Sequence, residues 1–180
     1  MKTGKIGLCH GVFDVVHAGH IHHLKTAKEH VDYLIVSITD DEYVNKGPGR
    51  PTQSSHRRKQ VLEALKDVDE VIINGSATSE NIIRKVKPDI YFKGQEYSDE
   101  DSDITGNIKM ERQSVEQYGG KIQFTGGFTD SSSRLIKAAN LTNLNEDQKA
   151  TLERLYDLGI DLDYLNKNLF EKFKRLKVLI

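Results

Sequence analysis

Two histidines separated by two small residues are the side chains of this sequence best placed to do chemistry. His17 and His20 flank a pair that includes Gly19, between a strand-like apolar stretch at 6–9 and an amphipathic, helix-like stretch at 21–30. The first amides of a helix have no partner within the helix, so such a junction is a natural anion site. Gly19 has no side chain to keep a ligand from the backbone. Because two imidazoles can donate hydrogen bonds to one anion, we expect this junction to bind phosphate.

Zinc binding is the alternative chemistry for this histidine-rich segment. Its candidate ligands are His17, His20, His22 and His23. Structural zinc sites usually include thiolates, and Cys9, the sole cysteine, lies in the predicted strand. We therefore favour phosphate over zinc, and we expect His22 and His23 to lie at the surface or to face a partner. The remaining histidines belong to no motif: His10, His30 and His56.

Strand-like and helix-like segments alternate along the chain. The predicted strands cover residues 5–10, 33–39, 70–74, 90–93 and 121–125. The predicted helices cover residues 19–30, 55–65, 79–87, 107–118 and 131–139. This alternation predicts an α/β fold, a Rossmann-like, doubly wound, parallel five-stranded sheet with helices on both faces. Such sheets bind ligands beyond the carboxyl ends of their strands, which is where the histidine junction falls.

Apolar residues at helical spacing predict which sides of the first two helices face the core. The residues expected to point inward are Ile21, Leu24 and Ala27 in the first helix, and Val61, Leu62 and Leu65 in the second. Ser54 or Ser55 is expected to be the N-cap of the second helix. Residues 40–54 have the composition of a polar loop.

The C-terminal part of the chain has a different pattern. Residues 145–158 and 161–173 resemble two short amphipathic helices, which predicts a helical appendage beyond the sheet domain. We therefore divide the chain into a domain at 1–140, an appendage or linker at 141–175 and a terminal piece at 176–180. That piece either opens a truncated following domain or is a natural C-terminal strand or helix end.

Composition excludes several classes of function. The chain of 180 residues carries 26 Lys and Arg against 27 Asp and Glu, so no overall basic field points to nucleic acid. One cysteine permits no intramolecular disulfide, which fits a reducing, cytoplasmic location. No apolar run approaches the roughly 20 residues that a membrane span needs. We expect neither a nucleic-acid partner nor a membrane partner.

Four segments, taken in order, resemble the HxGH nucleotidyltransferases, a cytidylyltransferase-like family. They are GVFDVVHAGH at 11–20, KGPGRPTQSSHRRKQVLEAL at 46–65, DIYFKGQEY at 89–97 and GGKIQFTGGFTDSSSRLI at 119–136. The last two are most similar to heptose-1-phosphate adenylyltransferases, ahead of glycerol-3-phosphate cytidylyltransferases. The ending RLKVLI at 175–180 resembles the first strand of ribokinase-like sugar kinases, to which some members of the family are fused.

The resemblance implies roles for residues near the histidine junction. His17, His20 and Lys46 would be catalytic, with Lys46 on the triphosphate or on the acceptor phosphate. The nucleotide would contact Gly11, Val12, Phe13 and Gly19. Asp14 would either hold Mg²⁺ through water or only orient the turn, as an Asx interaction does.

The resemblance also implies binding residues farther along the chain. Arg58 would clamp phosphate, with Arg57 as a rival and Arg50 as a further phosphate contact. Lys93 and Gly94, at the end of a predicted strand, would flank the nucleotide or the acceptor. A second anion site would open the predicted helix at 131–139, built from Thr129, Ser131, Ser132 and Ser133. No arginine precedes these serines, which departs from the cytidylyltransferase pattern.

The function implied is transfer of a nucleoside monophosphate from ATP or CTP to a phosphorylated small metabolite, with release of pyrophosphate. A sugar 1-phosphate such as heptose 1-phosphate is the first candidate acceptor, and glycerol 3-phosphate or another polyol phosphate, with CTP, is the second. Mg²⁺ is the expected cofactor and a homodimer the expected assembly. A non-catalytic nucleotide-binding domain is the alternative of another class. A redox Rossmann domain is disfavoured, because GVFDVVHAGH lacks the G-x-G-x-x-G turn.

Overall fold

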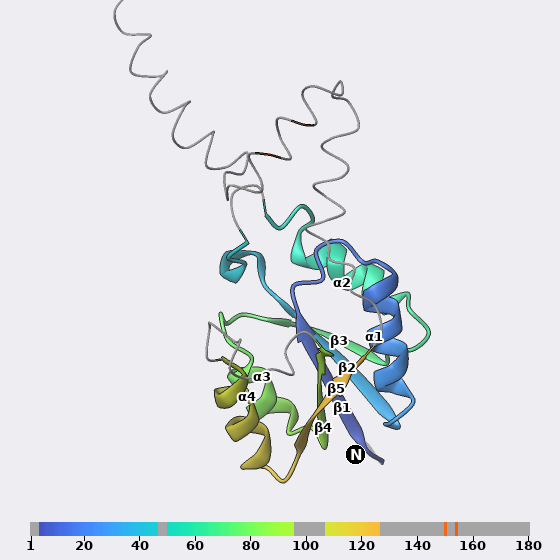
Figure 1. Ribbon diagram of the computed structural model, residues 1–180, viewed down its shortest axis with the longest axis vertical. Coiled ribbons are helices and arrows are strands. Elements are labelled where there is room, and N and C mark those ends of the chain that lie inside the picture. The colour runs from blue at the N-terminus through green and yellow to red at the C-terminus, as the bar shows by residue number, and fades with distance from the viewer. Residues whose placement is uncertain (1–3, 47–49, 96–106, 127–149, 151–153, 155–180) are drawn as a thin grey trace, which may run out of the picture. The chain divides into compact units, whose positions relative to one another are not determined.

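A computed structural model describes residues 4–46, 50–95, 107–126, 150 and 154 (Figure 1). The chain divides into two compact units, Met1–Ser132 and Ser133–Ile180. The fold and the site described below belong to the first unit. The helices expected at 131–139, 145–158 and 161–173 and the terminal piece at 176–180 lie outside the described residues, so those expectations stay predictions.

A five-stranded parallel sheet forms the centre of the first unit. In chain order its strands are β1 (Ile6–Gly11), β2 (Tyr33–Thr39), β3 (Glu70–Asn74), β4 (Ile90–Gly94) and β5 (Lys121–Thr125). Their spatial order is β3-β2-β1-β4-β5, and every neighbouring pair is parallel. The chain reverses its direction of travel across the sheet between β1 and β4, which makes the carboxyl ends of these two strands the switch point. The doubly wound fold expected from the sequence is confirmed.

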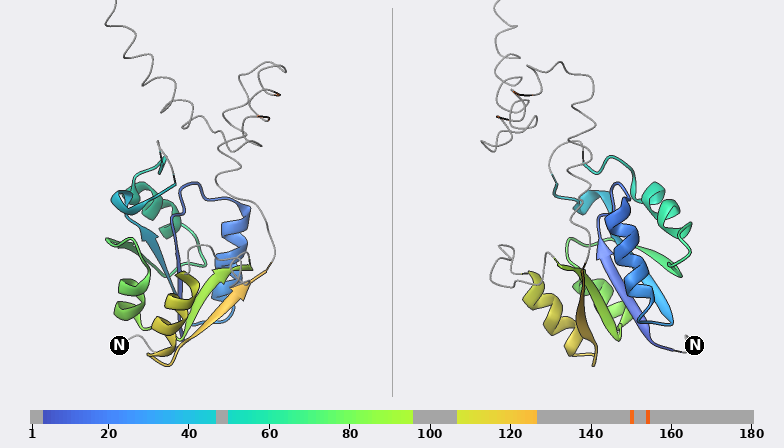
Figure 2. Two further views of the ribbon diagram at one scale, coloured as in Figure 1. Left: turned by 60° about the vertical axis from the view of Figure 1, so that its left-hand side comes forward. Right: turned by 45° about the vertical axis from the view of Figure 1, so that its right-hand side comes forward.

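Helices cover both faces of this sheet (Figure 2). The helices α1 (Ala18–Lys28) and α2 (Ser55–Glu63) pack on one face, and α3 (Glu80–Val86) and α4 (Asn107–Glu116) on the other. Strand side chains alternate between two buried clusters, as a period of two requires. Cys9, Val36 and Phe92 pack with α1 and α2, whereas their neighbours Leu8, Ile35 and Tyr91 pack with α3 and α4. Burial on both faces explains why the strand segments are continuous apolar runs.

The helices differ from expectation in detail. Leu24, Ala27 and Leu62 are buried as predicted, but Ile21 is 47% exposed and Val61 is 42% exposed, so their assignment to the core was wrong. Each lies at the edge of its apolar stripe, where helical spacing alone does not decide burial. Ser54 occupies the N-cap position of α2 without a side-chain capping bond. The segment expected to be a plain loop begins with a 3₁₀ turn, η1, at Asp41–Tyr43.

None of the helices among the described residues is both long and apolar enough to cross a membrane.

Candidate active site

The turn after β1 has a left-handed backbone at a bulky residue. Phe13 has φ +50°, a conformation that costs energy for any residue with a Cβ and recurs at functional sites. Its ring is buried and lies 4.9 Å, centroid to centroid, from the ring of His20. A Cβ on Gly11 would lie 3.1 Å from this ring, so Gly11 makes room for Phe13. Phe13 therefore packs beneath the histidine junction.

Asp14 anchors the loop that follows β2. Its Oδ1 accepts hydrogen bonds from Thr52 N at 2.7 Å, Thr52 Oγ1 at 2.9 Å and Gln53 N at 3.2 Å, and its Oδ2 accepts one from Arg50 Nε at 2.6 Å. Burial pushes the pKa of Asp14 upward, but the hydrogen bonds from Thr52, Arg50 and Gln53 outweigh it and hold the pKa below its usual value. Because the carboxylate is committed to these donors, Asp14 orients the turn and does not fit the role of a magnesium ligand.

His17 begins α1 as its N-cap. The backbone N–H of Gly19 donates to Nδ1 of His17 at 3.2 Å. Since Nδ1 accepts this bond, the ring proton of neutral His17 is on Nε2, which makes Nε2 a donor. A helix of eleven residues thus starts with a histidine whose tautomer is fixed by the helix backbone.

His20 lies against His17, with ring centroids 3.9 Å apart. Burial, followed by the charges of His17, His23 and Lys46, lowers the pKa of His20 to about 3. His20 is therefore neutral at physiological pH. The pair predicted from the sequence is confirmed as a geometric unit, and His20 within it is a neutral imidazole.

His22 and His23 tie α1 to the end of β5. His22 Nε2 lies 2.8 Å from the carbonyl oxygen of Gly126, and His23 Nδ1 lies 2.5 Å from Thr125 Oγ1. Burial lowers the pKa of His23 to about 4. Both were expected to lie at the surface or to face a partner. The bond of His22 is exposed, in agreement, whereas His23 is partly buried against the neighbouring strand. Within the described part of the chain, no group of three or more His, Cys, Asp or Glu side chains is arranged to hold a metal ion.

Arg58 differs from the phosphate clamp that the resemblance implied. Its side chain is fully buried and donates to four oxygens: Gln53 O at 3.0 Å, Val12 O at 2.5 Å, Thr39 O at 2.9 Å and Asp41 Oδ1 at 2.6 Å. These bonds join the turns after β1 and β2 to the start of α2. Arg58 is therefore a positioning residue. Its neighbour Arg57 is exposed.

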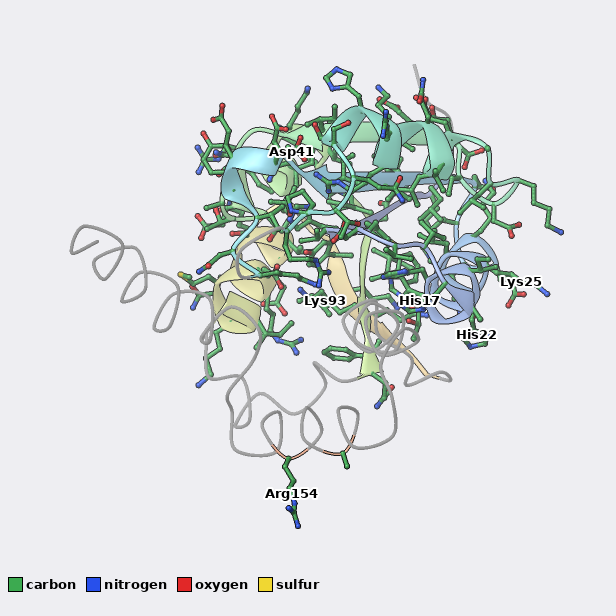
Figure 3. All side chains as sticks on the ribbon, turned by 90° about the horizontal axis from the view of Figure 1, so that it is seen from above. His17, His22, Lys25, Asp41, Lys93 and Arg154 are labelled. Carbon is green, nitrogen blue, oxygen red and sulfur yellow. The ribbon has the colours of Figure 1, made fainter. Side chains whose placement is uncertain are left out.

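A cavity of about 290 Å³ opens beside the histidine junction, on the face of the sheet covered by α3 and α4. Its polar lining comes from His10, Thr39, Lys46, Thr78, Ser79, Glu80, Lys93 and Glu111, with the backbone of Gly11 and Val12 at the end of β1. His17 and Lys93 lie at the carboxyl ends of the strands, as Figure 3 shows from above. The cavity thus lies at the switch point, with Lys46 in its lining near His20.

Lys46 and Lys93 come to this cavity from different strands. Lys46 follows β2 and η1, is exposed, and lies close enough to His20 for its charge to depress the pKa of that histidine. Lys93 lies near the end of β4 with its side chain 13% exposed. Arg50, bound to Asp14 through Nε, has a buried Nη2 without a hydrogen-bond partner in the structure. Three cationic side chains therefore lie around the switch point, two of them in ion pairs with carboxylates.

Other site residues were missed or fall outside the structure. His10 was assigned to no motif, yet it faces the cavity from β1, with Nδ1 3.0 Å from Ser37 Oγ. Its position before Gly11 was the available signal. Glu111 was also missed, because an isolated glutamate in an amphipathic helix has no distinguishing pattern.

Gly94 ends β4 as expected. The expected second anion site lies outside the described residues: Thr129, Ser131, Ser132 and Ser133.

A pair of imidazoles in ring contact at the switch point of a parallel sheet, near a cavity with lysines, is the arrangement expected of a nucleotidyltransferase. Comparison with known families agrees: residues 8–149 match the cytidylyltransferase-like family, and the chain belongs to it. It is an enzyme of the nucleotidyltransferase class.

Individual relatives are bifunctional proteins much longer than this chain. The chain is 43% identical over 128 residues to bifunctional protein HldE of Pseudomonas fluorescens SBW25, and 40% identical over 134 residues to that of Pseudomonas syringae pv. tomato DC3000. These matches cover 70% and 73% of the chain but only 26% and 27% of the relatives, so the chain spans about a quarter of their length.

Solved structures share the fold. A lipopolysaccharide core biosynthesis protein from Thermoplasma volcanium is similar with a TM-score of 0.53 and 24% identity, covering 71% of this chain and 99% of that one. A pantothenate synthetase from Thermus thermophilus is similar with a TM-score of 0.52 and 15% identity, covering 86% and 71% respectively.

Proposed function

We propose that the enzyme transfers a nucleoside monophosphate from ATP or CTP to a phosphorylated small metabolite and releases pyrophosphate. A sugar 1-phosphate, with heptose 1-phosphate first, is the proposed acceptor. The observation that carries the proposal is the pair His17 and His20, which places two imidazoles at the N-terminus of α1, near a polar cavity whose lining includes Lys46 and Lys93. The segments at 89–97 and 119–136 favour a heptose phosphate over a glycerol phosphate by their resemblance.

In this reaction an oxygen of the acceptor phosphate attacks the α-phosphorus of the triphosphate. The new P–O bond forms as the bond from the α-phosphorus to the bridging oxygen breaks, and pyrophosphate leaves with that electron pair. A phosphomonoester has a second pKa of about 6 and is anionic at neutral pH, so no general base is needed. His17 and His20 act as donors to oxygens whose charge increases in the transition state.

The cavity is the proposed acceptor site. It adjoins the histidine pair through Gly11 and Val12, so an acceptor phosphate at its mouth would lie close to a triphosphate bound at the α1 terminus. Lys46, in the cavity lining, would neutralise charge between the two substrates. Cationic side chains around an incoming anion also offset the repulsion between two phosphates.

Mg²⁺ is proposed to arrive on the triphosphate, where it would offset the charge of the phosphate oxygens. The protein residue expected to hold it, Asp14, does not fit, since its oxygens accept four hydrogen bonds from the loop after β2. The role of Asp14 is then to hold Arg50 and Thr52 in place.

A matrix of four nucleoside triphosphates against several phosphorylated acceptors, read by pyrophosphate release, tests the proposal. We expect turnover with ATP or CTP and a sugar 1-phosphate. If turnover occurs only with CTP and glycerol 3-phosphate, the acceptor is a polyol phosphate and not a sugar 1-phosphate. Nucleotide binding without turnover for any pair would contradict catalysis and favour a regulatory nucleotide-binding domain.

A further inference from the structure

Glu111, on α4, carries a buried carboxylate whose two oxygens are unequally satisfied. Oε1 accepts hydrogen bonds from Ser79 Oγ at 2.7 Å, Tyr91 OH at 3.0 Å and Lys93 Nζ at 3.2 Å. Oε2 lies 2.9 Å from Lys93 Nζ as an ion pair, but it accepts no hydrogen bond of good geometry from the residues that the structure describes. The side chain is 9% exposed.

The side chains around Oε1 of Glu111 are hydrogen-bond donors rather than acceptors. Burial and the adjacent carboxylate raise the pKa of Tyr91 well above its usual value, so its hydroxyl stays protonated and donates. Burial lowers the pKa of His10 to about 4, although the Glu111 charge acts in the opposite direction. His10 is therefore neutral on the opposite side of the same cavity. Within this group Glu111 and Lys93 form the ion pair.

This arrangement is unusual for a cavity that has only to bind phosphate. A carboxylate in the wall repels a phosphate and cancels the attraction of Lys93. It favours a ligand that carries hydroxyl donors as well as a phosphate, because a carboxylate oxygen short of donors accepts strongly from a hydroxyl. The lining adds further polar partners for such hydroxyls: His10, Thr39, Thr78 and Ser79.

We propose that Glu111 determines acceptor specificity: its Oε2 accepts a hydrogen bond from a hydroxyl group of the acceptor, so that the cavity selects polyhydroxylated phosphates over simple alkyl phosphates. The inference rests on the proposed function in one respect, that the cavity is the acceptor site. Lys93 is the ion-pair partner of Glu111, and a small movement of its flexible side chain opens Oε2 to the ligand.

Equilibrium binding to the full chain tests this without requiring turnover. Calorimetry would measure heptose 1-phosphate, a deoxy analogue of it, glycerol 3-phosphate and methyl phosphate, each with a non-hydrolysable triphosphate present. The variants are Glu111→Gln and, as a matched control, Glu116→Gln, an exposed position on the same helix outside the cavity lining.

The expected result has opposite signs for the two kinds of ligand. The wild type binds heptose 1-phosphate at least about tenfold more tightly than methyl phosphate, which corresponds to about 1.4 kcal/mol. Glu111→Gln weakens heptose 1-phosphate about tenfold and leaves methyl phosphate unchanged or tighter, because a repulsive charge is gone. Glu116→Gln changes neither.

Two results would overturn the inference. One is equal weakening of both ligands in Glu111→Gln, which is the signature of a structural role. The other is a wild type that does not distinguish heptose 1-phosphate from its deoxy analogues or from methyl phosphate, a measurement that stands even if the variant fails to fold. Selective binding without pyrophosphate release would contradict the transferase activity and leave the role of Glu111 intact.

Discussion

The imidazole rings of His17 and His20 lie with centroids 3.9 Å apart and planes 33° from one another. Two donors held this closely by a helix start and a buried ring are preorganised for one group of oxygens. We expect His17→Ala and His20→Ala each to lower turnover by ~10²–10³ with little change in thermal stability, as loss of a preorganised donor does. His56→Ala, an exposed change on α2, is the control. Wild-type turnover in either site variant would refute the catalytic assignment.

Stability should depend on pH through three partly buried histidines. The pKa values of His10, His20 and His23 are about 4, 3 and 4, below the ordinary value of 6.5. Below pH 6.5 the unfolded chain binds more protons than the folded one. The free energy of unfolding therefore decreases as the pH is lowered through this window, and it has its full value above it. Urea titrations should show a loss of more than about 1 kcal/mol from pH 7 to pH 5. A flat profile would contradict the burial of neutral imidazoles.

Lys46→Ala should act mainly on the transition state. Lys46 lies on an exposed segment near His20, where it can contact phosphates once both substrates are present. We expect turnover to drop by ~10² while the dissociation constant of the nucleotide changes little. Lys66→Ala, at an exposed position outside the cavity, serves for comparison. If calorimetry shows that nucleotide binding is abolished, Lys46 belongs to the resting nucleotide site instead.

Arg58→Met and Arg57→Ala form a matched pair for stability. Arg58 is buried with an ion pair to Asp41 and bonds to three carbonyl oxygens, so its loss leaves buried acceptors unpaired. Removing one partner of such a network costs about 3–5 kcal/mol. Arg57→Ala, at an exposed position, should lower the free energy of unfolding by no more than about 0.5 kcal/mol. Equal effects in chemical denaturation would show that Arg58 does not hold the three turns together.

Removal of divalent cations should abolish turnover. The triphosphate brings more negative charge than neutral histidines can offset, so Mg²⁺ is expected to be needed with it. Excess chelator should stop pyrophosphate release and added Mg²⁺ should restore it, whereas Asp14→Asn should alter stability more than the Mg²⁺ requirement. Full activity in chelator would contradict the dependence.

The sequence predicted the sheet and the histidine pair because both follow from local patterns. Runs such as Tyr33–Thr39 are apolar throughout, and His17 to His20 spans one helical turn at a strand end. Arg58 was misjudged because an arginine near a helix start has the same pattern whether its guanidinium faces a ligand or the carbonyl of Thr39.

The cavity at the switch point could not be predicted for a related reason. His10, Lys46, Lys93 and Glu111 lie far apart in sequence, and they converge only because β1 and β4 are neighbours in the sheet. Asp14 shows the reverse case, because it belongs to the motif but does not face a ligand. Its carboxylate binds Thr52 and Arg50, since the loop after β2 lies against it.

One of the four ladders of the sheet pairs fewer residues than the others. The β1–β4 ladder pairs three residues on each strand, whereas the β1–β2 ladder pairs six and the two outer ladders pair five. The cavity lies across this β1–β4 ladder. Lys46 and Thr39 are on the β2 side of it, and Lys93 and Glu111 are on the β4 side. A molecule that binds residues on both sides would hold the two parts of the sheet together. Amide hydrogen exchange in β4 and α4 should therefore slow when it binds, although those amides touch no ligand.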